Sequence, residues 1–459
     1  MNYCTYILKK LTLVITLFFS LNVFIYAEGT YHAGAGMEQQ LFEYDNQSVN
    51  NATGITVEDR PLYVDILNPG EVINIHVCGG ANADDIDIEI WDENGTTQLN
   101  TTHSITADNN SEAGHISCTD PFTATITNPY QYTPPSTGTY QIRLKNLAST
   151  TGYLSRFNVS VNNGSTSIDP QAAEGRLWAY RWGYNAGSYD EADSTDANYY
   201  IITDGGFTDT YYIWQLNFDK FAGFVYEIVA NDLGPDSPNG NGDTVAGMSV
   251  CIGDLSGTAC QNTNLGTNTV SPKYKVYLND PEKSYPRPQV GPQISNFYFL
   301  DNAGEDNTIS PGTSSGVQDN GTFNFTTNLE TNGTYELILD TDGSGDYGEG
   351  DVYLRGVARP GENNLTWDGN DNQGNPLPIG NYPATISIKP GEYNFSAVDA
   401  ETSGGPGNNG LTIHAVEGNG TVDSSDTVHW DDVSASNLTG FNMDGSLGRY
   451  HNLGDFTAG

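Results

Sequence analysis

Two short apolar runs enclose a stretch that is crowded with carboxylates. The first run, Tyr335–Leu339, ends at Asp340, and the second run, Val352–Leu354, begins directly after Asp351. Aromatic and aliphatic residues of this kind favour strands, whereas the Asp and Gly residues between them favour turns. Two strands joined by one loop form a β-hairpin. This stretch therefore predicts antiparallel β-structure in this part of the chain.

The loop has the ligand spacing of a calcium-binding loop of the EF-hand type, mounted here on strands instead of helices. Loop positions 1, 3, 5, 7, 9 and 12 hold Asp340, Asp342, Ser344, Asp346, Gly348 and Asp351, and position 6 holds Gly345. We predict calcium as the cofactor. Its ligands would be the side chains of Asp340, Asp342 and Ser344, the backbone carbonyl of Asp346, and Asp351 closing the shell. The alternative is a solvated acidic turn that binds no ion.

The residues that follow contain a second group of turn signals. They comprise a Trp-Asp-Gly turn, an Asp/Gly loop and the opening of a last strand: Trp367, Asp368, Gly369, Asp371, Gly374, Pro378, Gly380 and Tyr382. This pattern resembles the Ig-like repeats of secreted bacterial surface proteins and of flagellar hook-cap proteins. The resemblance covers residues 293–390 and implies an Ig-like domain, but it implies no particular partner.

A second ion is also conceivable in this region. The oxygen-bearing residues are Asp368, Asn370, Asp371 and Asn372. Hydrogen bonding within Asx turns explains the same residues, and the sequence leaves both alternatives open.

Residues 54–162 have a strand pattern of their own. Ile86, Ile88 and Ile90 alternate with acidic residues, which predicts a half-buried strand. One strand follows Pro69-Gly70-Glu71, and another opens at Gly138-Thr139-Tyr140. This order resembles the bacterial pre-peptidase C-terminal domain, a β-sandwich appended to many secreted enzymes and surface proteins.

The remaining segments complete the expected domain organisation. Lys9 and Lys10 precede the apolar run Leu11–Ile25, and Ala27 is a suitable cleavage point, so residues 1–27 are expected to be a secretory signal peptide. An uncleaved membrane anchor is the alternative. The other expected segments are an N-terminal extension (28–53), an aromatic-rich β-sandwich (172–280) and a β-rich C-terminal segment (391–459), for which truncation is one alternative.

Composition supports an all-β class and argues against nucleic acid as a partner. The formal net charge is −40, and only 16% of the residues are charged, while Gly, Asn, Thr and Tyr are abundant. A surface this acidic repels nucleic acids and anionic lipids. We predict several β-sandwich domains in tandem, Ig-like or jelly-roll-like, with no transmembrane span after signal removal.

The aromatic-rich block allows two interpretations. Trp178, Tyr180, Trp182 and Tyr184 are spaced to share one face of a strand. That face is either part of a sandwich core or a sugar-stacking platform. Exposure of the rings distinguishes the two.

No catalytic constellation stands out. The seven histidines lack metal-ligand spacing, and no Gly-x-Ser-x-Gly elbow is present. We therefore expect a non-catalytic structural or adhesive protein, secreted or on the cell surface, whose partner is a protein or glycan outside the cell. The alternative is a carbohydrate-binding accessory region of a secreted hydrolase.

Four cysteines remain after signal removal, and an even number in an exported chain favours disulfides. We predict the local pairs Cys78–Cys118 and Cys251–Cys260, one of three possible connectivities. Each bridge should stabilise the fold by roughly 2–4 kcal/mol through loop closure. Mass analysis of non-reduced peptides should find these two linkages, and free thiols at all four positions in exported, oxidised protein would rule them out.

Overall fold

The computed structural model describes twenty ranges of the chain. They are 28–29, 40–42, 61–77, 85–106, 112–115, 128–146, 157–163, 174–185, 195–222, 226–231, 272–301, 321–345, 351–371, 374–378, 380–391, 393–398, 402–403, 410–416, 428–429 and 450–451. The expected all-β class is confirmed, because the described residues form strands and turns without any helix. The strand pairs are antiparallel and lie in several sheets.

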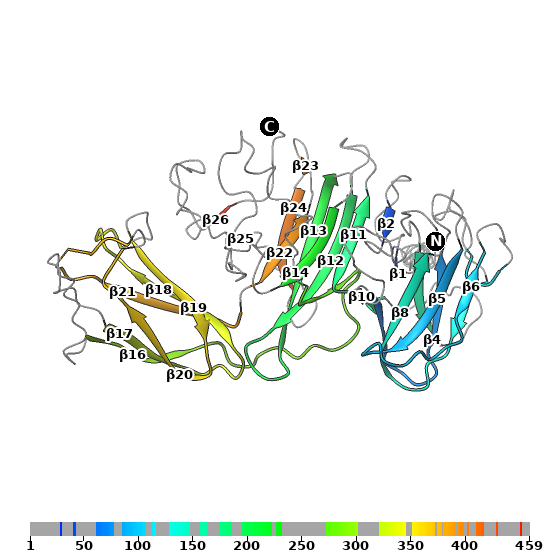
Figure 1. The fold of residues 1–459 in the computed structure, drawn as a ribbon, viewed down its shortest axis with the longest axis horizontal. Helices are drawn as coiled ribbons and strands as arrows, with labels where there is room; N and C mark the ends of the chain where they lie inside the picture. The colour runs from blue at the N-terminus through cyan, green and yellow to red at the C-terminus, as the bar shows by residue number, and fades with distance from the viewer. Residues whose placement is uncertain are drawn as a thin grey trace, which may run out of the picture.

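The first sandwich has two sheets that share one core (Figure 1). Alternation explains its strands: Ile86, Ile88 and Ile90 are fully buried on the core side, as their period of two predicts. One sheet contains β3 (Leu62–Ile66), β5 (Ile86–Asp92), β6 (His103–Ile105) and β8 (Gly138–Asn146), and the other contains β1 (Glu28–Gly29), β4 (Val72–Val77), β7 (Tyr130–Tyr132) and β9 (Phe157–Asn162).

The second sandwich recruits strands from the C-terminal segment. From 172–280 come β10 (Leu177–Ala179), β11 (Arg181–Asn185), β12 (Thr195–Asp204), β13 (Tyr211–Ala222), β14 (Tyr226–Asn231) and β15 (Lys275–Tyr277), and from elsewhere β2 (Gln40–Phe42), β22 (Asn394–Val398), β23 (Thr402–Ser403) and β24 (Gly410–Val416). Strand β22 pairs with β14, and β24 pairs with β13 along its full length. Residues 394–398 and 410–416 of the expected C-terminal segment are therefore paired with strands of the expected aromatic-rich segment.

A single 10-stranded sheet runs through both sandwiches. Strand β10 makes the join, since Trp178 pairs with Tyr63 of β3 on one side and with Tyr277 of β15 on the other. The sheet order is β23-β13-β12-β15-β10-β3-β8-β5-β6, with β24 beside β13. The residues expected to form two separate sandwiches thus share backbone hydrogen bonds.

A row of polar and aromatic side chains crosses the face of this sheet opposite the main core. Its successive cross-strand members are Trp91, Gln141, Tyr63, Trp178, Tyr277, Tyr200, Gln215 and His414. The rings of Tyr63 and Trp178 are stacked with centroids 4.1 Å apart. Cross-strand pairs of this kind contribute about 0.2–1 kcal/mol each, so the row reinforces the join between the two sandwiches.

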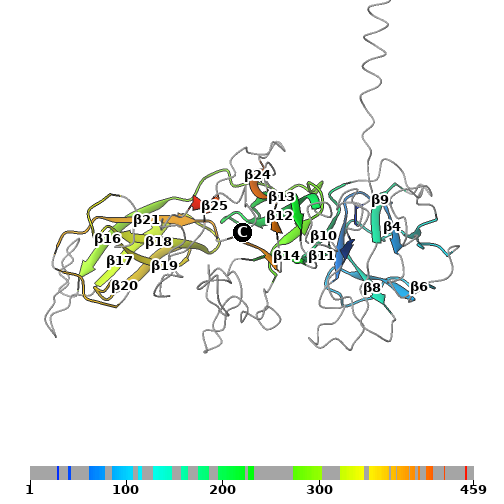
Figure 2. The same cartoon turned by 90° about the horizontal axis from the view of Figure 1, so that it is seen from above.

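The third sandwich is inserted between β15 and β22 of the second. One sheet holds β16 (Ile294–Asp301), β17 (Gly321–Thr327) and β20 (Gly361–Trp367), and the other holds β18 (Gly333–Leu339), β19 (Val352–Ala358) and β21 (Ala384–Lys389). Its core is separate and takes Phe299, Phe323 and Trp367 from one sheet and Leu337 and Leu339 from the other. Figures 1 and 2 both place these strands at one end of the molecule, beside the second sandwich. A further pair, β25 (Val428–His429) and β26 (Tyr450–His451), completes the described strands.

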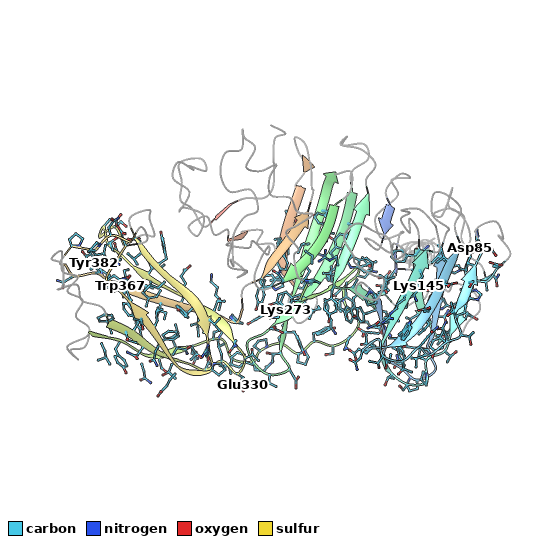
Figure 3. All side chains as sticks on the ribbon, in the orientation of Figure 1. Asp85, Lys145, Lys273, Glu330, Trp367 and Tyr382 are labelled. Atoms are coloured by element: carbon cyan, nitrogen blue, oxygen red, sulfur yellow. The ribbon has the colours of Figure 1, made fainter. Side chains whose placement is uncertain are left out.

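The turn between β12 and β13 contacts the inserted sandwich. The backbone N–H groups of Glu330 and Thr331 donate to the Gly206 carbonyl at 3.0 and 3.2 Å. The N–H of Thr208 donates to Glu330 Oε2 at 3.0 Å, and Figure 3 labels Glu330 at this contact. The inserted sandwich is therefore attached through this turn as well as through its two chain connections.

Four charged side chains are buried where the first two sandwiches meet, and a fifth, Glu282, is about half exposed beside them. We call Glu28, Asp65, Glu71, Arg176 and Glu282 the junction cluster. The Arg176 side chain is 1% exposed and forms ion pairs of 2.9 Å with Glu71 and 2.7 Å with Glu282. Burial opposes ionisation of Glu71, but hydrogen bonds from Arg176 and Asn68 outweigh it and lower its pKa to about 2. The cluster thus contains a buried, multiply bonded ion pair.

We predict that Arg176→Met lowers the free energy of unfolding by about 3–5 kcal/mol, because it leaves the Glu71 carboxylate buried without its partner. Urea unfolding should measure the loss. Lys273→Met is the matched control: its ion pair with Asp204 is about half exposed on both sides, and exposed pairs contribute only about 0–1 kcal/mol.

The same ion pair predicts a dependence on acid. Since the folded-state pKa of Glu71 lies below its ordinary value of 4.5, its contribution is present above pH 4.5 and is lost as the pH falls toward 2. This part of the acid dependence should shrink in Arg176→Met. Equal losses in both variants, with unchanged acid profiles, would contradict the assigned role.

Candidate metal centre

The hairpin predicted from the sequence is confirmed, and it positions the two ends of the acidic loop. Strands β18 and β19 pair in register from Gly333 opposite Ala358 to Leu339 opposite Val352. Leu339 and Val352 are buried in the core of the third sandwich. Asp340 directly follows β18 and Asp351 directly precedes β19, so the hairpin holds these two residues side by side at the edge of that core.

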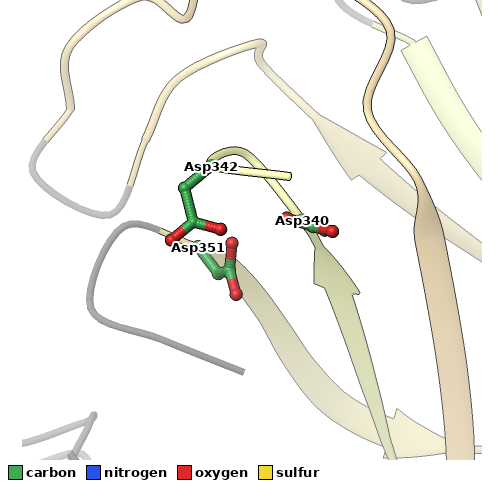
Figure 4. A group of neighbouring side chains, drawn as sticks. All are labelled: Asp340, Asp342 and Asp351. Atoms are coloured by element: carbon green, nitrogen blue, oxygen red, sulfur yellow. The ribbon is translucent and has the colours of Figure 1, made fainter. Parts of the chain in front are cut away.

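Three carboxylates converge at this end of the hairpin (Figure 4). Asp340, Asp342 and Asp351 each offer one oxygen, and these oxygens all lie within 4.8 Å of one another. Asp351 is 1% exposed, Asp340 is partly buried and Asp342 is exposed. The structure thus brings together three of the five predicted ligands, with one carboxylate buried and one facing solvent.

The loop backbone donates hydrogen bonds to these carboxylates. Asp340 accepts from the N–H groups of Gly343 at 2.7 Å and Gly345 at 3.0 Å. Both glycines have a φ of 73°, a left-handed conformation that glycine adopts without strain. Asp351 Oδ1 accepts from the N–H of Thr341 at 2.9 Å. These bonds hold the oxygens toward the centre of the loop.

Ser344 contacts the cluster through Asp342. Its backbone N–H donates to Asp342 Oδ1 at 2.8 Å, and hydrogen bonds from Ser344, the side-chain one foremost, lower the pKa of Asp342. The carboxylate is therefore kept ionised and suited to a cation. Asp346 and Gly348 lie outside the described residues.

The donor set fits calcium. Carboxylate and carbonyl oxygens are hard ligands, which suit Ca²⁺ and Mg²⁺ more than zinc or copper. Between the two, Ca²⁺ tolerates varied coordination geometry, whereas Mg²⁺ demands a near-ideal octahedron, so a loop of three carboxylates with different burial suits Ca²⁺ better. Calcium would be held by these three carboxylates and would neutralise their mutual repulsion.

The loop after β20 has a sufficient explanation without a second ion. Asp368 Oδ1 accepts from the N–H of Asn370 at 3.1 Å, and Asp371 Oδ1 accepts from the N–H of Asn375 at 2.7 Å. The first is an Asx-turn bond, one of the two alternatives that the sequence leaves open, and the second closes a longer turn of four residues. Asn372 lies outside the described residues.

The predicted aromatic face is wrong in part. Trp178 and Trp182 do not share a face, because β10 lies in the large sheet and β11 in the sheet opposite. Trp178 packs with Tyr63 and Tyr277, whereas Trp182 lies in the main core. Their exposures are 1% and 0%. Neither ring is available to stack on a sugar.

Other predicted features lie outside the described residues: the signal peptide 1–27 and the cysteines Cys78, Cys118, Cys251 and Cys260. Among the residues that the structure describes, no helix has the length and apolarity needed to cross a bilayer.

Comparisons with known proteins give no family for this chain. No family model and no curated protein matches it. A solved structure of a DUF4785 family protein from Legionella pneumophila is similar at 12% sequence identity, over 79% of this chain and 88% of that chain, with a TM-score of 0.15. A similarity this low carries no argument about fold or function.

We predict that Trp178→Ala behaves as a core substitution and lowers the free energy of unfolding by about 3–5 kcal/mol. The buried ring packs against several aromatic neighbours, and its removal leaves a cavity. Denaturant unfolding should measure this loss, and oligosaccharides should leave the tryptophan fluorescence of the wild type unchanged. A stable variant with lost sugar binding would show instead that Trp178 belongs to a binding platform.

Proposed function

We propose that the chain is an exported structural or adhesive protein, secreted or displayed on the cell surface, and that calcium stabilises its third sandwich. It has no catalytic role in this proposal, and its partner is a protein or glycan outside the cell. The observation that carries the calcium part is the convergence of Asp340, Asp342 and Asp351 within 4.8 Å.

Electrostatics support a role for a cation at this loop. Three like charges at such separations repel one another, and this repulsion disfavours the compact loop when no cation is present. A bound cation would replace this repulsion by attraction, because it would attract the carboxylates of Asp340 and Asp342 in the loop and that of Asp351 beside β19 at the same time. It would thereby fasten β18 to β19 at the open end of the hairpin.

The expected gain follows from mass action. A ligand that binds only the folded state stabilises it by RT ln(1 + [L]/Kd), about 2.7 kcal/mol at a hundredfold excess over Kd. Extracellular calcium modules typically have affinities of roughly 0.1–1 mM. A site of that strength fits a protein that functions outside the cell.

The burial of Trp178 and Trp182 leaves these two rings unavailable to stack on a sugar, which favours the structural or adhesive role over the carbohydrate-binding alternative. The charge of the chain agrees with the extracellular proposal. A formal net charge of −40 keeps separate copies apart and disfavours nucleic acids and anionic membranes as partners.

We predict opposite effects of Asp342→Asn in the two ionic conditions. In millimolar calcium the melting temperature of the 293–390 fragment, which has its own core, should fall because a ligand is lost. In chelator it should stay the same or rise, because one repelling charge is removed. Calorimetry with and without calcium measures both.

Asp368→Asn is the matched control, since it removes an equal charge from an exposed loop of the same sandwich. It should leave the calcium-induced shift intact. A fragment whose melting temperature ignores calcium, or an Asp342→Asn variant with an unchanged shift, would refute the site. For the non-catalytic role, turnover of a polysaccharide, ester or peptide that one carboxylate or serine substitution abolishes would overturn it.

A further inference from the structure

Glu28 makes more buried hydrogen bonds than its short strand pairing with β9 requires. It forms the two-residue strand β1 with Gly29, opposite Val159 and Asn158 of β9. Its side chain is 2% exposed. The carboxylate accepts the backbone N–H groups of Gly175 at 2.9 Å, Arg176 at 3.0 Å and Leu177 at 2.8 Å.

These contacts lie at the join between the first two sandwiches. Asn279, which follows β15, also donates to Glu28, at 3.1 Å. The carboxylate therefore bridges the start of β10 and the end of β15 from a strand that belongs to the first sandwich. No other residue type of this length supplies two acceptor oxygens for four donors, since Gln would present an amide group to N–H donors.

Gly29 shows that the backbone is closely fitted here. Its φ is 134°, and a Cβ at this position would lie 2.4 Å from the carbonyl oxygen of Phe157. A substitution would force β1 away from β9 and would draw Glu28 out of its site. Both residues of β1 are thus specified by close contacts with distant parts of the chain.

The sequence places the expected signal-peptide cleavage at the bond directly before Glu28. We propose that the Ala27–Glu28 bond is the processing site. We propose further that Glu28 is the first residue of the mature chain and that its carboxylate fixes the join between the two sandwiches. This inference rests on the export part of the proposed function. The position of the cut then matters to the fold, because a cut one residue later removes Glu28 and its carboxylate.

The chemistry of the cut is hydrolysis. A signal peptidase adds water across the Ala27–Glu28 amide, which leaves a carboxylate on Ala27 and an ammonium group on Glu28. That ammonium group lies on the same residue as the buried carboxylate and attracts it. Burial raises the pKa of Glu28 to about 7 in the uncut chain, so the new positive charge favours the ionised form that the four donors require.

The charged groups on the segments packed against Glu28 do not provide this compensation. They are Glu174, Arg176, Asp280, Glu282 and Lys283. The guanidinium of Arg176 already binds Glu71 and Glu282, and the ammonium of Lys283 lies 3.7 Å from Asp65. The other three are acids. The ammonium group created by cleavage is therefore the added positive charge on this side of the join.

The test has two parts. First, mass spectrometry of the exported protein should find Glu28 as the N-terminal residue. Second, a purified chain that starts at Glu28 should melt at least about 5 °C above one that starts at Gly29. Glu28→Gln should show a similar loss, and the exposed Glu362→Gln should show none.

Several results would overturn the proposal. Two results would refute the role of the Glu28 carboxylate while leaving export and calcium binding intact. One is a mature chain that starts beyond Glu28, and the other is equal melting temperatures for the chains that start at Glu28 and at Gly29. A chain from the exported fraction that still begins at Met1 would refute the processing site and the cleaved leader together. Because the second part uses purified protein, it decides the role of the side chain independently of export.

Discussion

The pairing of β10 with β3 and β15 is the interaction on which the arrangement of the first two sandwiches depends. Three residues of one short strand supply the backbone hydrogen bonds that turn two groups of strands into one sheet. A strand this short is weakly specified by pairing alone. The additional specification comes from its flanks, where Arg176 is bound by Glu71 and Glu282 and where the N–H groups of 175–177 are bound by Glu28. Buried charges in the junction cluster and aromatic rings on the adjacent sheet face therefore fix the same join.

Acidic residues have two different roles in this chain. In the junction cluster, the carboxylates of Glu28, Asp65 and Glu71 are buried and bind hydrogen-bond donors within the fold, including the guanidinium of Arg176 for Glu71. In the β18–β19 loop, three carboxylates face one another and accept hydrogen bonds from the loop backbone. The first group organises the protein internally. The second group is the place where we propose that a cation binds.

Local features of the fold were predictable from the sequence, whereas pairing between distant segments was not. Alternation predicted β5 and the β18–β19 hairpin, and loop spacing predicted that Asp340, Asp342 and Asp351 would converge. The period-two pattern from Trp178 to Tyr184 failed because the chain passes from one sheet to the opposite sheet at Tyr180, and periodicity does not reveal such a crossing. Pairing of β24 with β13 links residues nearly two hundred positions apart, and the site of Glu28 depends on residues 147 positions or more away. Neither leaves a local sequence signal.

The insertion of the third sandwich between β15 and β22 has a mechanical consequence. Chain segments enter and leave this sandwich through the same neighbour, and β22 and β24 return to pair with β14 and β13. A pulling force applied to the chain on either side of the second sandwich is carried first by these returning strands. The chain enters β13 and leaves β24 at the same end of their ladder, so such a force would open the seven cross-strand pairs one after another from Ile213–Val416, before tension reaches the inserted strands. The sandwich that holds the acidic loop is thereby shielded from force that passes along the rest of the molecule.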